Sequence, residues 1–161
     1  MSGASRIDLD ACQDRIAYHF VDRRLLEAAL THASGVQHRL ASNERMEFLG
    51  DAILGVVVCE RLYHQYPEYS EGELTKIKSV VVSRETCAKL SEGLGLQQFL
   101  ILGKGMAADP FVPKSVLAAV FESLIAAIYL DRGMDAAAQF VVEHVDAEIE
   151  SAVACEFAGN F

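Results

Sequence analysis

Apolar residues recur at intervals of three and four positions along almost the whole chain, which is the spacing of one helix face. Period-2 alternation is rare, there are only three prolines, and there is no Asn-Gly or Asp-Gly hairpin signal. The pattern therefore predicts an all-α domain. The helices that we expect are Ile7–Tyr18, Arg23–Thr31, Asn43–Tyr66, Glu71–Val82, Arg84–Gly93, Val116–Leu130 and Met134–Ala154.

The segments between the expected helices contain fewer recognisable sequence patterns. Ser70 and Glu73 have the spacing of a capping box at the start of one helix. His32–Ser42 and Leu96–Gly105 are expected as loops, a break is expected at Asp131–Gly133, and no structure is expected for the last seven residues.

The segment NERMEFLGDAIL, from Asn43 to Leu54, places three acids in an apolar helical pattern. Offsets of three and seven residues bring Glu44, Glu47 and Asp51 within about 60° of one another on one face. Like charges at this spacing repel, so a cation is expected to receive them. A solvated acidic face at a helix start, with Asn43 as N-cap, is the plain alternative. The positions expected to face the core are Met46, Leu49, Ile53, Val56 and Val57.

Val116–Leu130 is apolar all round and carries a single charge, Glu122. Such a helix is buried inside a domain, and this one is too short to span a membrane. A lone buried carboxylate is costly unless it is paired, protonated or metal-bound. Glu47, Asp51 and Glu122 therefore predict a site for Mg²⁺ or Mn²⁺, because carboxylate-only ligation favours hard cations. This reasoning alone leaves open a magnesium-dependent hydrolase or a structural ion site.

Composition limits the remaining classes of function. The 161 residues suit one domain, and no signal-peptide core or membrane-length apolar run is visible, so we expect a cytoplasmic protein. The four cysteines are widely scattered, which is typical of reduced thiols in a core. His32 and His38 are expected to cap or lie in a loop rather than bind metal. The net charge of −9 argues against nucleic-acid binding, unless the acids surround cations or a basic partner domain is missing.

The acid-bearing segment closely resembles the signature of the ribonuclease III family, NERLEFLGDAxL. Three further blocks resemble that family in the same order along the chain: LLEAALTHAS (Leu25–Ser34), EGELTKIKSVVVS (Glu71–Ser83) and VFESLIAAIYLD (Val120–Asp131). The chain is thereby identified as a member of this family over nearly its whole length, with residues 1–155 as the endonuclease domain.

The resemblance implies a helical bundle that forms a homodimer and cleaves double-stranded RNA, for example ribosomal RNA precursors, with Mg²⁺. By the same resemblance, Glu47, Asp51 and Glu122 are metal ligands, with Asp51 and Glu122 as the catalytic pair. Glu44 and Glu71 match further acids that line the cleft. Phe48 matches an aromatic side chain inserted into the partner subunit, although an ordinary core position is the alternative for it.

Ala119 departs from the family pattern, which reads LADxFE and has an aspartate three residues before the buried glutamate. Losing such a group typically costs about 10–100-fold in metal affinity or activity. Three explanations stand: a natural site in which water completes the Mg²⁺ shell, an engineered change that traps substrate, or lost catalysis with retained binding. We favour a retained but weakened activity.

The chain ends where many family members continue into a basic double-stranded-RNA-binding domain. Residues 156–161 are expected to begin the linker to that absent domain, although a natural short form is the alternative. Two other functions are weighed against an active nuclease. One is a catalytically inactive RNA-binding or assembly scaffold. The other is a di-metal carboxylate protein, which is disfavoured because no Glu has a His three residues on.

Overall fold

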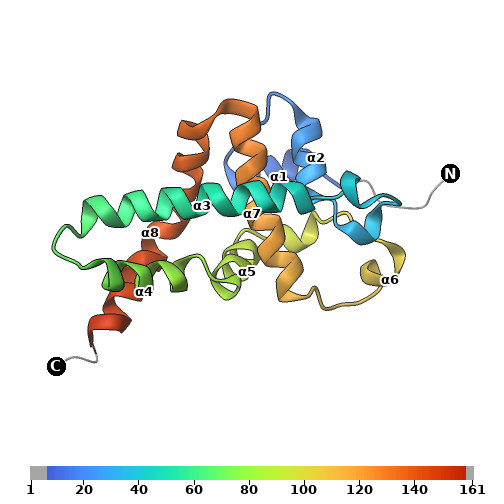
Figure 1. Ribbon diagram of the computed structural model, residues 1–161. Coiled ribbons are helices and arrows are strands. Elements are labelled where there is room, and N and C mark those ends of the chain that lie inside the picture. The colour runs from blue at the N-terminus through green and yellow to red at the C-terminus, as the bar shows by residue number, and fades with distance from the viewer. Residues whose placement is uncertain (1–6, 159–161) are drawn as a thin grey trace.

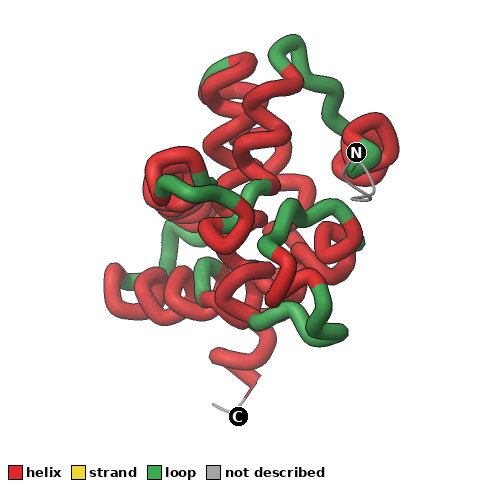
Figure 2. Tube along the Cα trace, turned by 90° about the vertical axis from the view of Figure 1, so that its right-hand side faces the viewer, coloured by secondary structure: helices red, strands yellow, loops and turns green. Residues whose placement is uncertain are grey.

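The computed structural model describes residues 7–158, which fold as a bundle of helices (Figure 1). The helices are α1 (Leu9–Ile16), α2 (Arg23–Leu30), α3 (Glu44–Gln65), α4 (Glu71–Val81), α5 (Arg84–Gly93), α6 (Lys104–Ala107), α7 (Lys114–Arg132) and α8 (Met134–Ala158). Loops join them, and no strand forms within the described residues (Figure 2). The all-α prediction is confirmed.

The centre of the bundle is α7, which contacts α2, α3, α5 and α8. Its side chains are buried on nearly every side, and Val120, Phe121, Leu124 and Ile125 have no exposed surface. This agrees with the apolar pattern around the whole helix. The long α3 runs across the molecule and crosses α7 near its own first turns, while α4 returns alongside α3 (Figure 1).

Several helix ends differ from the sequence prediction. α1 ends at Ile16 because Ala17 adopts a left-handed conformation with φ of 56°. α7 continues through Arg132, so the chain breaks only at Gly133, where φ is 90°. The expected loop from Leu96 to Gly105 contains a 3₁₀ turn and the start of α6. α8 extends to Ala158, so most of the tail expected to lack structure is helical, and residues 159–161 lie outside the described residues.

Of the two helix caps predicted from the sequence, one forms as expected and the other does not. The capping box of Ser70 and Glu73 at the start of α4 is confirmed. Asn43 does precede the first residue of α3, but its side chain forms no capping bond. That side chain is buried, and its amide donates to the carbonyl oxygen of Ala29 at 3.0 Å. The hydroxyl of Ser123 on α7 donates to the same oxygen at 2.7 Å. Asn43 therefore fixes the start of α3 against α2 and α7.

The cysteines and loop histidines follow the prediction in part. Cys12 and Cys87 are buried, whereas Cys59 and Cys155 are exposed, so a core role is right for only half of them. The Nδ1 atom of His32 accepts a hydrogen bond from the backbone N–H of Ser34, which caps a 3₁₀ turn as expected. Within residues 7–158, no helix combines the length and apolar character needed to cross a bilayer.

Candidate active site

The crossing of α3 and α7 leaves no room for a side chain at Gly50. A Cβ atom built there would lie 1.7 Å from the carbonyl oxygen of Glu122 and 2.6 Å from its carbonyl carbon. Only glycine allows the two backbones to approach this closely. Asp51, the next residue on α3, is thereby brought beside Glu122 on α7. Sequence analysis missed Gly50, because the hydrophobic pattern gives no weight to a residue without a side chain.

Asp51 and Glu122 lie within hydrogen-bonding reach of each other. Burial of Glu122 raises its pKa to about 8, and the nearby carboxyls of Asp51 and Glu47 contribute to that rise. Burial and a neighbouring carboxyl both favour the protonated form of Glu122, and a bound cation would offset both effects. The two predicted ligands on different helices are thus in one place.

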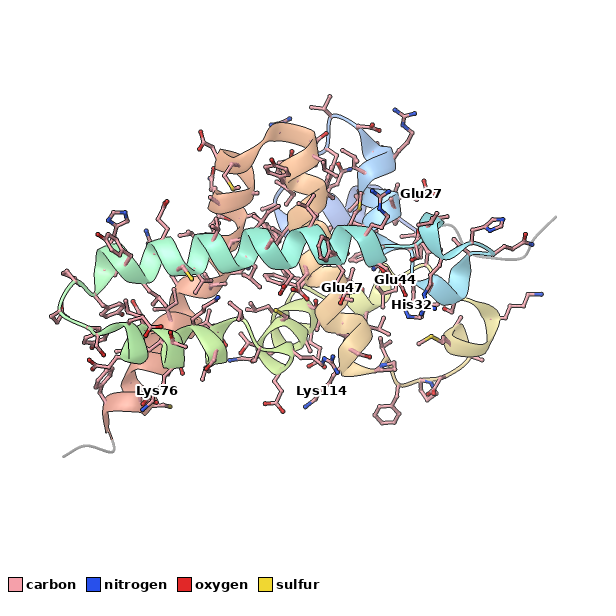
Figure 3. The ribbon with its side chains drawn as sticks, viewed as in Figure 1. Glu27, His32, Glu44, Glu47, Lys76 and Lys114 are labelled. Carbon is pink, nitrogen blue, oxygen red and sulfur yellow. The ribbon has the colours of Figure 1, made fainter. Side chains whose placement is uncertain are left out.

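Glu47 lies one turn before Asp51 on α3, and Figure 3 shows it near Glu44 at the start of that helix. Burial raises the pKa of Glu47, and the carboxylates of Glu44 and Asp51 add to that effect. Glu44 itself is bonded elsewhere, because the guanidinium of Arg39 donates to its carboxylate at 2.9 Å. The acidic cluster of the single chain therefore consists of Glu47, Asp51 and Glu122, with Glu44 at its edge.

Glu71 belongs to a different helix from the acids of the cluster. It is the first residue of α4, and its carboxylate accepts a hydrogen bond from the hydroxyl of Thr75 at 3.0 Å. Seven residues, or about 10 Å of helix rise, separate it from Lys78, which lies against α3. The expectation that Glu71 lines the same cleft remains a prediction.

Ala119 lies one turn before Glu122 on α7 and is 7% exposed. This turn of the buried helix therefore brings no acid to the cluster. Among residues 7–158, no set of three or more His, Cys, Asp and Glu side chains is arranged to hold a metal ion as they stand. The donors of the acidic cluster are all carboxylate oxygens, and two of them are in contact, which fits a hard cation that keeps several waters.

Phe48 lies on the surface of α3 with 83% of its side chain exposed, so the alternative of a core position is wrong. It lines a groove of about 780 Å³ with Leu40 and Leu130, which are also exposed. We call these three residues the apolar patch. The expectation that Val56 faces the core is also wrong, because Val56 is 57% exposed. The buried face of α3 is set by Gly50, Ile53, Leu54, Val57, Val58 and Leu62.

Two basic residues near the acids were missed from the sequence. Lys78 is half-buried, and its ammonium lies 4.0 Å from the Cβ position of Gly55, one turn beyond Asp51. The guanidinium of Arg84, at the start of α5, acts to lower the pKa of Glu47 and of Glu122. Both residues come from other helices, so no spacing within one segment could have related them to the acids.

Comparisons with known proteins agree with this architecture. A family model described as ribonuclease-III-like matches residues 22–149. Ribonuclease 3 of Rhodopirellula baltica is 51% identical over 152 residues, which cover 94% of this chain and 57% of that protein. Ribonuclease 3 of Dehalococcoides mccartyi is 42% identical over 150 residues, covering 89% and 63%. The chain thus spans about six tenths of the length of these relatives.

Solved structures show the same fold. The nuclease domain of ribonuclease III from Campylobacter jejuni, studied for flexibility in a region involved in dimer formation, matches with a TM-score of 0.82 at 31% identity. The match covers 88% of this chain and 98% of that one. Dicer from Giardia intestinalis matches with a TM-score of 0.69 at 25% identity, covering 92% of this chain and 20% of that one.

Proposed function

This chain belongs to the ribonuclease-III-like family, and we propose that its acidic cluster cleaves double-stranded RNA. The observation that supports the proposal best is the close crossing of α3 and α7 at Gly50, which brings Asp51 beside Glu122. A half-buried carboxyl with a raised pKa beside a second carboxyl is an arrangement that a divalent cation stabilises. The oxygen-only donor set favours Mg²⁺, for which Mn²⁺ can substitute.

The positions of the acidic side chains suggest a different role for each in catalysis. Asp51 is exposed and would face an incoming strand, whereas Glu122 is half-buried and its backbone is fixed at the crossing. Together with Glu47 they would hold the cation. When bound, the cation supplies an activated water and neutralises charge on the scissile phosphate. Glu44 and Glu71 are proposed to line the cleft that receives the RNA.

The finer parts of the proposal rest on the family resemblance. They are a homodimer joined through Phe48, a role in processing ribosomal RNA precursors, and a cytoplasmic location. Residues 1–155 would be the endonuclease domain, although Glu156, Phe157 and Ala158, which were expected in a linker, belong to α8. A net charge of −9 repels an RNA backbone, so binding by this chain should be weak and strongly dependent on salt.

Ala119 supports a second candidate function, an inactive scaffold that binds RNA without cutting it. Its turn of α7 is buried and offers the cation no oxygen. The intact carboxylates of Glu47, Asp51 and Glu122 argue for activity, because three acids around an unused site destabilise the fold through mutual repulsion. We therefore propose an active but weakened enzyme, with about 10–100-fold to be regained by restoring an acid.

Cleavage of long double-stranded RNA with Mg²⁺ at low salt tests these proposals. The unchanged chain should cut slowly, Ala119→Asp should cut faster, and Glu122→Gln should not cut. Cleavage by Ala119→Asp alone would make the chain an inactive scaffold as it stands. Undiminished cleavage by Glu122→Gln would overturn the assignment of the site.

A further inference from the structure

Arg84 is held in place by a tightly bonded turn between α4 and α5. The hydroxyl of Ser83 accepts the backbone N–H of Thr86 at 3.2 Å and so caps α5. The hydroxyls of Ser83 and Thr86 both donate to the carbonyl oxygen of Val80, at 2.8 and 2.7 Å. The backbone of Arg84, the first residue of α5, is therefore fixed relative to the end of α4.

The face of α5 that begins with Arg84 lies against α7. Residues 84, 87, 88 and 91 share one helix face, and Cys87, Ala88 and Ser91 are buried. The hydroxyl of Ser91 donates to the carbonyl oxygen of Leu117 on α7 at 2.5 Å. One turn after Arg84, Cys87 has its pKa raised to about 12 by burial, with contributions from the carboxyls of Glu122 and Asp51. The side chain of Arg84 therefore emerges at the solvent end of this face, beside the acidic cluster.

The guanidinium of Arg84 is close to the acids without being bonded to them. Its side chain is exposed, and within residues 7–158 it forms no ion pair shorter than 4.0 Å. The neighbouring Glu85 is engaged instead by Lys114 at 3.7 Å. Through space, the charge of Arg84 acts on both Glu47 and Glu122. A guanidinium in this position keeps its fork of N–H donors free for another anion.

We propose that Arg84 binds a backbone phosphate of the RNA strand held at the acidic cluster and so positions that strand for cleavage. The inference rests on the proposed function, because it needs RNA at the acids. A polyanionic strand that approaches three carboxylates is repelled by them, and a fixed positive charge beside the metal site lowers this repulsion by receiving a neighbouring phosphate. The planar guanidinium matches two phosphate oxygens, and the N-terminal end of α5 adds positive potential beneath it.

Binding of a short labelled RNA duplex tests this role, with Ca²⁺ replacing Mg²⁺ and RNA integrity checked on a denaturing gel. Arg84→Gln should bind about 10-fold more weakly than the unchanged chain. The slope of log K against log salt should also fall by about one for each phosphate that the variant no longer binds. Arg84→Lys, which keeps the charge but not the fork, should keep the slope and part of the affinity. Lys89→Gln is the matched control, because Lys89 lies on the same helix and pairs with Glu148 on α8 at 2.8 Å.

Metal affinity separates a residue that binds phosphate from one that merely arranges the acids. Mn²⁺ binding without RNA, followed by calorimetry, should be unchanged or tighter in Arg84→Gln, because a positive charge leaves the cluster. Weaker binding of both Mn²⁺ and RNA would show that Arg84 organises the carboxylates, which overturns the proposal. Unchanged RNA affinity and salt slope in Arg84→Gln would also overturn it and leave the nuclease function standing. A chain that binds no RNA duplex at low salt would instead remove the proposed function and, with it, the role of Arg84.

Discussion

Gly50 decides, as a single residue, how closely the two halves of the acidic cluster approach. The missing side chain lets the carbonyl of Glu122 lie against α3, and Asp51 follows directly on the same helix. Glycine weakens a helix interior by about 1 kcal/mol relative to alanine. At this position, close backbone contact outweighs that cost.

Gly50→Ala is expected to destabilise the fold by about 2 kcal/mol or more, because the added Cβ meets backbone atoms, which cannot turn away as a side chain can. Urea unfolding followed by circular dichroism measures the change. Gly93→Ala is the matched control, since among residues 7–158 no heavy atom outside its chain neighbours and its own helix backbone lies within 4 Å of its Cβ position. The control should be neutral or stabilising by up to about 1 kcal/mol. Equal stability of the two variants would contradict the crossing geometry.

The burial of His144 makes the free energy of unfolding depend on pH. Its ring lies edge-on to Phe140 and Phe121, with centroid distances of 4.7 and 6.3 Å. Burial lowers the pKa of His144, and the charge of Glu143 only partly opposes this. The folded state thus prefers the neutral ring, so this contribution to stability is present above the unfolded pKa of about 6.5 and is lost as pH falls through the folded pKa.

The free energy of unfolding should therefore fall more steeply between pH 7 and pH 5 in the unchanged chain than in His144→Phe. Phenylalanine retains an apolar ring between the same neighbours but does not titrate. Urea titrations at several pH values give the two slopes. Identical slopes would mean that protonation of His144 is not linked to folding.

Between elements, Asp131 ties the end of α7 to the turn between α1 and α2. Its side chain is 1% exposed, and its carboxylate accepts the hydroxyl of Tyr18 at 2.6 Å and the backbone N–H groups of Val21 and Asp22 at 3.0 and 2.9 Å. Burial acts to raise the pKa of Asp131, but these hydrogen bonds outweigh it and lower the pKa. The bonds join segments more than a hundred residues apart in sequence.

Asp131→Asn should destabilise the chain by about 1–3 kcal/mol, because a charged acceptor of three hydrogen bonds is removed from a buried position. Thermal unfolding measures this, and the exposed Asp14→Asn should change stability by less than about 0.5 kcal/mol. In a double-mutant cycle with Tyr18→Phe, the two changes should be non-additive. Strict additivity would place the stabilisation outside the Tyr18–Asp131 bond.

Most helices could be predicted from sequence because amphipathic spacing and caps are local signals. The start and end of α5 agree with the prediction, and Glu122 could be related to Asp51 because a lone acid in an apolar helix needs a partner. The rotation of α3 about its own axis was harder to predict from the sequence. Val56 is apolar but exposed, since Gly50 rather than bulk determines which face meets α7. The places of Arg84 and Lys78 depend on helices that meet only in the folded chain.

At the scale of the whole molecule, the apolar patch of Leu40, Phe48 and Leu130 is a candidate surface for binding another protein subunit. These residues come from a 3₁₀ turn, α3 and α7, and each is more than half exposed around one groove. Patches of this kind are typical of interaction sites. The homodimer proposed for this chain would cover Phe48 directly beside Glu47.

Phe48→Glu should shift the chain from dimer towards monomer, because a charge cannot enter an apolar groove without losing its hydration. Sedimentation velocity at several concentrations measures the equilibrium. Phe111→Glu is the matched control, since Phe111 is 82% exposed in a different loop and the substitution adds the same charge. An unchanged dimer in Phe48→Glu, or equal dissociation of both variants, would place the interface elsewhere.

The close approach at Gly50 also defines the smallest unit that could be transplanted into another protein. Copying only Glu47, Asp51 and Glu122 onto two helices of a designed scaffold would leave the carboxylates too far apart, because an ordinary interhelical spacing of about 8–10 Å separates the axes. A designer would have to copy the glycine and the backbone carbonyl that fills its place, and then select the acids. The feature that must be transferred unchanged is the close helix crossing, whereas the acidic side chains on it can be varied afterwards.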